Sequence, residues 1–386
     1  MTDPLPRPVP RWLHLWAILA VVVTLVLLAI GQLVTSFGAG MADRVWPTEP
    51  WYVFRTATAD EKARFRDEFA FFIEHSHRIA GWTVGGIVIV LAIGVLWTEP
   101  RKAARGAALA GLFVLVVSYG DFHRGLMAQK DVSAKAVQLP QKPMATALAG
   151  AALMVAAAAF GSAGKGVRVL GALALIAVMV QGLLGGFRVK LNELVGTDLA
   201  AFHGVFAQVV FGLLTWLAVA TARPAVAAPS ADARRLHRWA VVFAHLIFVQ
   251  VIFGAWVRHF PAPQPQRLHF LTAFLATAIA VWLLRAVFAD AAVRARAGRF
   301  AWALAVLLAL QLALGVEAWL AKFGAELVKV TPQSGATRTL HALVGSGVWA
   351  VSLALSLRLR PVASPVPTTE PVVSAGAREP ARAANA

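Results

Sequence analysis

Long apolar segments alternate with short polar segments along nearly the whole chain. A helix that crosses a bilayer needs roughly 20 mostly apolar residues. The segments that meet this requirement are 13–36, 70–97, 103–119, 143–161, 168–187, 198–221, 238–257, 268–289, 300–321 and 340–357. Segment 103–119 is short and segment 143–161 is rich in alanine, so these two could instead be interfacial or re-entrant. The pattern predicts an all-α membrane protein with ten spans.

Lysine and arginine are unevenly shared between the connecting segments. With the N-terminus inside, thirteen fall in the four short inner loops and seven in the three short outer loops. Cytoplasmic loops of membrane proteins are enriched in these residues. We therefore predict a multi-pass protein of the inner (cytoplasmic) membrane with both termini in the cytoplasm. The first apolar segment is too long for a signal peptide, and no cleavage site follows it.

The chain divides into two halves that resemble each other. Residues 223–237 (RPAVAAPSADARRLH) are predicted to form a cytoplasmic linker between an N-terminal bundle, 1–222, and a C-terminal bundle, 238–360. Residues 361–386 are rich in proline, alanine and serine and are predicted to be a disordered tail. A repeated spacing occurs at Gln181–Gly185–Arg188, Gln250–Gly254–Arg258 and Gln311–Gly315. Such repeats are typical of membrane bundles that arose by duplication.

The composition narrows the function classes. Hydrophobic residues make up 59% of the chain, charged residues 14%, and the mean hydropathy is +0.69. A typical globular chain has about 25% charged residues, so a soluble enzyme and a disordered protein are both excluded. The net charge of +17 falls mainly in the inner segments, where it faces anionic lipid, and we predict no nucleic-acid partner. The absence of cysteine excludes disulfides, thiolate metal sites and cysteine nucleophiles, which leaves the histidines as candidate metal ligands.

Four histidines recur at one depth. His77, His203, His269 and His341 each lie in the first two turns of a segment predicted to run inward from the outer surface. The residues four positions further on are small: Gly81, Ala207, Ala273 and Gly345. A small residue on the same helix face leaves room for a flat ligand, and facing histidines are the axial ligands of bis-histidine heme iron. A single histidine there would be read as interfacial, but the fourfold recurrence favours heme ligation.

The other six histidines are expected to have other roles. His14 and His237 are placed at the inner surface, and His123 and His259 in outer loops. We expect His245 to bond a neighbouring helix in mid-span, and His75 to face away from the ligand site.

The motif Glu74-His75-Ser76-His77-Arg78 concentrates charge inside a predicted span. An ionisable residue there costs about 2.5–3.5 kcal/mol on insertion scales and marks a functional site by default. Glu74 shares a helix face with His77 and could exchange protons beside a metal site. Arg78 could pair with a ligand carboxylate such as a heme propionate. The alternative to a functional site is a simple pair of Glu74 and Arg78 at the membrane surface. Glu317 is expected to be structural and to have no partner.

Several of these stretches resemble the heme A synthase family. They are GQLVTSFGAGMADRVWP (31–47), EHSHR (74–78), VQGLLGGFRV (180–189), AFHGVFAQ (201–208) and VQVIFGAWVRH (249–259), within a resemblance that covers about 12–100 and 166–359. The resemblance implies two pseudo-symmetric four-helix bundles. It also implies successive oxidation of one methyl group of heme O to the formyl group of heme A.

The resemblance also implies roles for particular residues. His77 and His203 would flank the substrate heme O, with Arg78 nearby, and Glu74 would be the catalytic glutamate. His269 and His341 would be the axial ligands of a heme b cofactor. Iron would then be the metal in both halves.

The chain departs from this family in three ways. The family has eight spans, and His77 and His203 lie 126 residues apart whereas His269 and His341 lie 72 apart. This difference predicts a helix pair inserted at about 100–165, which could cover the substrate site. Phe270 stands where the family often has arginine, for which Arg267 could substitute. Many relatives carry a cysteine pair, so this chain would belong with the cysteine-free members.

Two other functions are compatible with the histidines. One is a diheme b-type membrane electron carrier that takes electrons from quinol, and the other is a heme-binding transporter or assembly protein. Neither needs Glu74, which therefore favours the synthase. The expected partners are the lipid bilayer, a quinol or ferredoxin-like electron donor, a heme O synthase and further copies of this chain.

Overall fold

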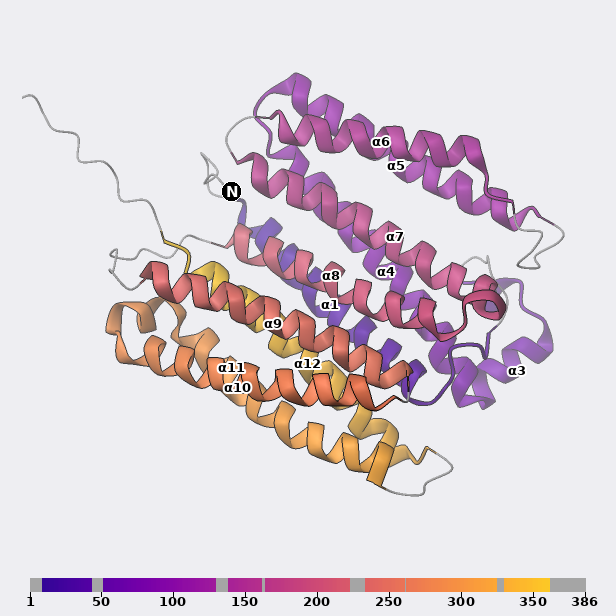
Figure 1. The fold of residues 1–386 in the computed structure, drawn as a ribbon. Helices are drawn as coiled ribbons and strands as arrows, with labels where there is room; N and C mark the ends of the chain where they lie inside the picture. Colours follow the sequence, from indigo (N-terminus) through magenta and orange to yellow (C-terminus); the bar gives the residue numbers. More distant parts are fainter. Residues whose placement is uncertain are drawn as a thin grey trace, which may run out of the picture.

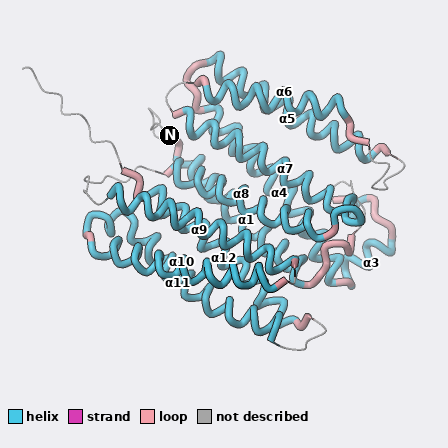
Figure 2. The backbone as a smooth tube through the Cα atoms, in the orientation of Figure 1, coloured by secondary structure: helices cyan, strands magenta, loops and turns pink. Residues whose placement is uncertain are grey.

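The computed structural model describes residues 9–43, 51–129, 138–161, 164–222, 233–260, 262–324 and 330–361. All secondary structure in these ranges is helical (Figure 2). Ten of the described helices are long and apolar enough to cross a membrane. The predicted all-α membrane fold with ten spans is therefore confirmed. The two segments for which a re-entrant course was open, 103–119 and 143–161, both lie in helices of spanning length.

The ten long helices lie side by side with their axes in roughly the same direction, obliquely across the view (Figure 1). They are α1 (Arg11–Ser36), α4 (Phe69–Trp97), α5 (Lys102–Met127), α6 (Gln141–Ala159), α7 (Lys165–Val195), α8 (Thr197–Thr221), α9 (Ala233–His259), α10 (Pro263–Ala289), α11 (Ala291–Trp319) and α12 (Pro332–Arg358). Two short helices, α2 (Tyr52–Arg55) and α3 (Ala59–Asp67), precede α4, and a π-helical turn, η1 (Leu320–Gly324), extends α11. We call the end of the bundle at which α4 begins, beside α3 in Figure 1, the histidine end.

Several helices continue beyond the apolar segments that predicted them. The predicted segment 340–357 belongs to a helix that begins at Pro332, and 268–289 to one that begins at Pro263. Proline is favoured in the first helical turn because its missing N–H needs no partner there. In α12 the Thr331 hydroxyl accepts from the Ser334 N–H, and the Ser334 hydroxyl in turn accepts from the Thr331 N–H. These polar turns extend the helices beyond their apolar segments.

The helices form two groups with separate apolar cores. One core is built by α1 and α4–α8, and the other by α9–α12. The groups meet where α1 and α8 pack against α12 and α8 packs against α9. The division into domains at 223–237 stays a prediction, because residues 223–232 lie outside the described ranges, as do 362–386 of the predicted tail.

The helices α5 and α6 form a pair at one edge of the molecule, alongside α4 and α7 (Figure 1). Their backbones touch at two glycines. A Cβ at Gly111 would lie 2.5 Å from the Met154 nitrogen, and one at Gly150 would lie 2.7 Å from the Leu115 nitrogen. Small residues allow such close packing between membrane helices, where dispersion contacts replace the hydrophobic effect as the source of attraction.

Large apolar side chains cover much of the exposed surface. Phe113, Leu148, Phe160, Phe274 and Trp302 are each more than 60% exposed. Patches of this kind are rare on soluble monomers. Here all but Phe160, which directly follows α6, lie on helices of spanning length. The protein is thus a multi-pass membrane protein whose outer surface faces lipid.

The glycine contact between α5 and α6 predicts how that pair is stabilised. We expect Gly111→Leu to lower the free energy of unfolding by about 1–3 kcal/mol, because the added side chain must push the two backbones apart. Thermal unfolding in detergent measures this change. Gly106→Leu, on the exposed side of the same helix with no atom within 4 Å of the added Cβ, is the control and should leave the midpoint unchanged.

Candidate functional site

Each of the four recurring histidines packs against a glycine of a neighbouring helix. If each glycine carried a Cβ, that atom would lie very close to the Cε1 atom of the histidine ring. The distances would be 2.8 Å for Gly31 and His77, 3.1 Å for Gly185 and His203, 3.2 Å for Gly254 and His269, and 3.1 Å for Gly315 and His341. The helix pairs are α1–α4, α7–α8, α9–α10 and α11–α12. The glycine of each repeat therefore contacts the histidine of the next long helix. Gly31 makes the same contact with His77 and was not identified from the sequence.

The glutamine of the repeat holds the same histidines. Gln181 Nε2 donates to the His203 carbonyl oxygen at 3.1 Å, and Gln250 Nε2 donates to the His269 carbonyl oxygen at 2.9 Å. Gln311 Nε2 lies 3.4 Å from His341 Nε2. A histidine that is supported through its backbone or ring has its side-chain direction restricted, which is what a metal ligand needs.

The C-terminal pair of histidines faces across the bundle. The ring centroids of His269 and His341 lie 6.3 Å apart, with an interplanar angle of 79°. Each metal–imidazole bond is about 2 Å long, so two rings that share one metal ion have centroids roughly 6 Å apart. In the described part of the chain, Nδ1 of each ring is buried without a hydrogen-bond partner. The pair therefore fits axial ligation of one iron ion.

The described residues contain no cluster of three or more His, Asp or Glu side chains that could hold a metal ion. An ion at these histidines would need most of its ligands from elsewhere. A porphyrin supplies four nitrogens and leaves two axial positions for histidine, which matches the pairwise arrangement.

One cavity joins the two histidine pairs. It has a volume of about 1180 Å³ and is lined by His77 and His203 on one side and by His269 and His341 on the other. Single-ligand pockets are commonly about 300–1,000 Å³, so this cavity has room for more than one. The four small residues that follow the histidines by four positions, Gly81, Ala207, Ala273 and Gly345, all line it.

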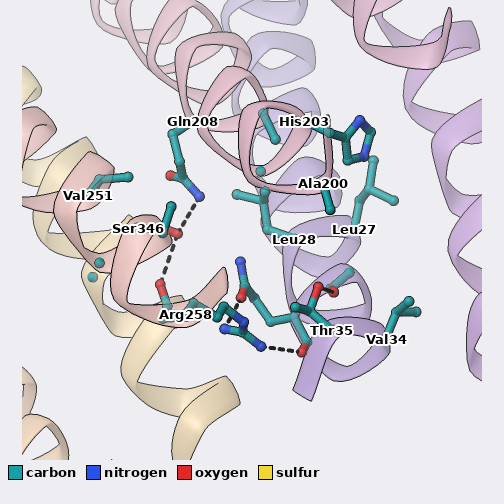
Figure 3. A pocket seen from close by; sticks show the side chains of 18 of the residues that line it. Leu27, Leu28, Val34, Thr35, Ala200, His203, Gln208, Val251, Arg258 and Ser346 are labelled. Carbon is teal, nitrogen blue, oxygen red and sulfur yellow. Dashed lines mark hydrogen bonds between the residues drawn. The ribbon is translucent and has the colours of Figure 1, made fainter. Parts of the chain in front are cut away.

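The halves are joined beside this cavity by a buried polar contact. Gln208 Nε2 of α8 donates to Ser346 Oγ of α12 at 2.9 Å (Figure 3). The two residues occupy equivalent positions, five residues after His203 and His341 respectively. The contact therefore lies where the two halves meet in a pseudo-symmetric way.

Glu74 belongs to a buried network of charged groups at the histidine end. The Asp43 backbone N–H donates to Glu74 Oε2 at 2.7 Å, and Arg78 donates to Glu74 Oε1 at 3.2 Å. Arg78 also forms an ion pair with Asp43 at 3.1 Å. Glu74 is 5% exposed and Asp43 is fully buried. A simple surface pair of Glu74 and Arg78 is therefore excluded, since the arginine joins two buried carboxylates.

Asp43 is the residue of this network that the sequence reasoning missed. Its carboxylate accepts from the Tyr52 hydroxyl at 3.0 Å and lies 3.1 Å from His75 Nδ1. Burial and the nearby Asp43 carboxylate raise the pKa of Tyr52, so the phenol keeps its proton and acts as donor. Asp43 lies in the stretch 31–47 that carried the family resemblance, but a single acidic residue in a loop gave no signal of a buried role.

Basic side chains line the cavity at the histidine end. They are Arg78, Arg188, Arg258, Lys322 and Arg338. Arg258 donates to Gln32 and Ser36, and Lys322 donates to backbone oxygens of Val257 and Arg258. Apart from Arg78, none forms a salt bridge with a carboxylate of the described residues. The cavity thus presents several cationic side chains to an anionic ligand, whereas Arg267 is not part of its lining.

Three of the other histidines and Glu317 contact protein groups. His14 lies 3.2 Å from Thr221 Oγ1, and His237 lies 2.9 Å from the Ser356 carbonyl oxygen. His245 lies 2.8 Å from the Val241 carbonyl oxygen of its own helix, so the expected bond to a neighbouring helix is wrong. Glu317, expected to lack a partner, accepts from the Thr337 hydroxyl at 3.1 Å.

A comparison with known protein families gives one match. The sequence model of the family described as "Cytochrome oxidase assembly protein" (COX15-CtaA) matches residues 2–127 and 144–265. No curated protein and no solved structure matches significantly. The matched ranges include Glu74, His77, Arg78 and His203 and end just before His269. The assignment of the C-terminal pair therefore rests on its equivalence to the N-terminal pair and on the ring geometry.

The buried network predicts a large difference between two aspartates. We expect Asp43→Ala to cost about 3–5 kcal/mol of stability, because removing one partner leaves buried charge uncompensated. Thermal unfolding in detergent measures the loss. Asp67→Ala removes an exposed partner of Arg66 and should leave the midpoint unchanged. Equal effects of the two substitutions would contradict the structural role given to Asp43.

Proposed function

Because the chain belongs to the cytochrome oxidase assembly protein family, we propose that it is the heme A synthase of oxidase assembly. In this proposal it oxidises one methyl group of heme O, through a hydroxylated intermediate, to the formyl group of heme A. The observation that carries the proposal is Glu74, fixed by Asp43 and Arg78 on the cavity wall one helical turn before His77.

The two histidine pairs have different tasks. His77 and His203 bind the iron of the substrate heme O, and His269 and His341 hold a resident heme b. All four histidines line one cavity, and the spacing of the His269 and His341 rings suits two ligands of one ion; both observations support these assignments. When bound, heme b supplies one-electron redox chemistry beside the substrate site.

Glu74 is the proton-exchanging group of the substrate half. With O2 as the oxidant, each of two successive hydroxylations of the methyl group consumes two electrons and two protons and releases one water, and the resulting gem-diol loses water to give the aldehyde. A carboxylate within reach of the reacting edge can give or accept a proton in these steps. The Asp43 N–H and the Arg78 guanidinium each hold one oxygen of Glu74, so its direction is restricted. The low exposure of the network keeps bulk water from the reacting group.

The basic side chains orient the two porphyrins. The propionates of a porphyrin lie on one edge, so a row of cations at the histidine end places that edge there. Arg188 and Arg78 lie near the substrate side, and Arg258, Lys322 and Arg338 near the heme b side. Phe270 needs no arginine substitute on this account, since Arg258 and Arg338 line the cavity on that side.

The finer points of location and partners belong to the same proposal. The protein lies in the inner membrane with both termini in the cytoplasm, and the histidine end faces outward. A quinol or a ferredoxin-like protein delivers electrons, a heme O synthase delivers substrate, and copies of the chain associate. A diheme electron carrier and a heme transporter remain the alternative functions. Both would work without Glu74.

The synthase proposal predicts a specific product in living cells. Expressed in a host that makes heme O but no heme A, the chain should produce heme A or its hydroxylated precursor, detected by extraction and chromatography of the hemes. Glu74→Gln should reduce both products at least a hundredfold, as expected when general acid–base catalysis is removed, with heme content unchanged. Glu317→Gln, a second carboxylate in a span, is the control. Full yield from Glu74→Gln would favour the electron-carrier or transporter function.

The proposal also predicts which histidines the resident heme needs. We expect His269→Ala and His341→Ala each to abolish the low-spin heme b absorption of the purified protein, because each removes one axial ligand. Substitution of His245, which is bonded to its own helix, should leave the spectrum intact. An unchanged low-spin spectrum in either ligand variant would refute the assignment.

A further inference from the structure

The two halves differ on one side of the cavity, although their helices repeat the same motifs. Counting from the motif histidine or glutamine, Gly85 of α4 corresponds to Thr277 of α10, and Gly182 of α7 corresponds to Leu312 of α11. In addition, Gly186 of α7 corresponds to Val316. Every one of these changes removes side-chain volume in the N-terminal half. At these three positions the N-terminal half has the smaller residues, whereas Val84 and Trp82 of α4 are larger than their equivalents Ala276 and Phe274. The Tyr119 hydroxyl would lie 2.9 Å from a Cβ at Gly182, so the open space is on the side of Gly85.

These glycines border an arm of the cavity that runs away from the histidine end. The deepest α4 residue that lines the cavity is Ile89, and Leu175 and Val178 of α7 line it at a similar depth. Ile89 lies twelve residues beyond His77, or about 18 Å along the helix at about 1.5 Å per residue. A Cβ at Gly85 or Gly86 would have no atom within 4 Å. The arm is therefore long, apolar and open.

Helix α5 closes the arm toward the lipid. Val116, Tyr119, Gly120 and His123 of α5 line the cavity. The Tyr119 hydroxyl donates to the Met179 carbonyl oxygen of α7 at 3.3 Å. On the other side, the His123 ring packs edge-on against Trp82 of α4, with ring centroids 5.5 Å apart. Thus α5 is attached to both α4 and α7, and it covers the gap that the glycines leave between them.

We infer that this arm binds the isoprenoid chain of the substrate porphyrin, an inference that rests on the proposed function. Heme O carries a long isoprenoid alcohol chain and heme b does not. The half proposed to hold heme O has the arm, whereas the half proposed to hold heme b has Thr277, Leu312 and Val316 in the equivalent places. The arm is continuous with the cavity between His77 and His203, so the porphyrin and its chain share one site.

The arm explains how the substrate half selects its porphyrin. Lipid tails are as apolar as the arm, so transfer of the chain from the bilayer brings little hydrophobic gain. Shape then decides which half accepts heme O, because Thr277, Leu312 and Val316 stand at the equivalent places in the C-terminal half. A side chain placed in the arm overlaps with the isoprenoid chain but not with a porphyrin that lacks it.

The test is a spectroscopic titration of the purified protein with its resident heme in place, using heme O and protoheme as separate probes. Gly85→Leu should weaken heme O binding at least tenfold, because overpacking costs about 1–3 kcal/mol, and should change protoheme binding less than twofold. Gly85→Ala should have a smaller effect of the same kind. Gly106→Leu, on the exposed side of α5, is the matched control for stability and should leave both affinities unchanged.

The outcomes separate this inference from the synthase proposal, because binding is measured without turnover. Equal weakening of both porphyrins by Gly85→Leu, or no weakening of either, would overturn the arm as the chain site. Selective weakening in a protein that never oxidises heme O would support the arm and refute the synthase function instead.

Discussion

The close approach of a histidine ring to a glycine on the neighbouring helix is the constraint on which this structure depends. It occurs four times, with a Cβ at each glycine calculated to lie 2.8–3.2 Å from the ring. A larger residue would push the imidazole out of position or separate the helices. The contact therefore couples two properties, because the spacing of the long helices and the direction of the four candidate ligands are set together.

The repeated contact gives each half an equivalent pair of histidines, but the residues around the two pairs differ. Both halves have a histidine pair, but only the N-terminal half has the carboxylate of Glu74 beside its first histidine; the equivalent residue in α10 is Gln266. The buried Asp43 and Arg78 hold that carboxylate in the apolar part of the protein. A buried charge needs such partners, since an unpaired one would neutralise or destabilise the fold. The acid–base role proposed for Glu74 thus depends on a loop that only one half has.

Helices α5 and α6 show how an edge element can take part in a site. Glycine contacts hold α5 and α6 against each other. The Tyr119 hydrogen bond and the Trp82–His123 ring contact connect α5 to the rest of the bundle. The prediction that it is an insertion stays open, because the family match covers residues 102–127 and part of α6. Of this pair, α5 lines the cavity; that the pair covers a substrate site stays a prediction.

The sequence by itself determined the ten spans and the set of histidines, because both follow from local properties: apolar length, spacing along a helix, and recurrence. It did not reveal that the glycine of each repeat is the seat of the next histidine, or that Glu74 is held by Asp43. Those relations join residues that lie 15–46 positions apart along the chain, and no local pattern encodes them. Only the tertiary structure decided which glycines face an imidazole, which face open space, and which carboxylate is buried. Each outcome depends on how the helices pack rather than on what each helix contains.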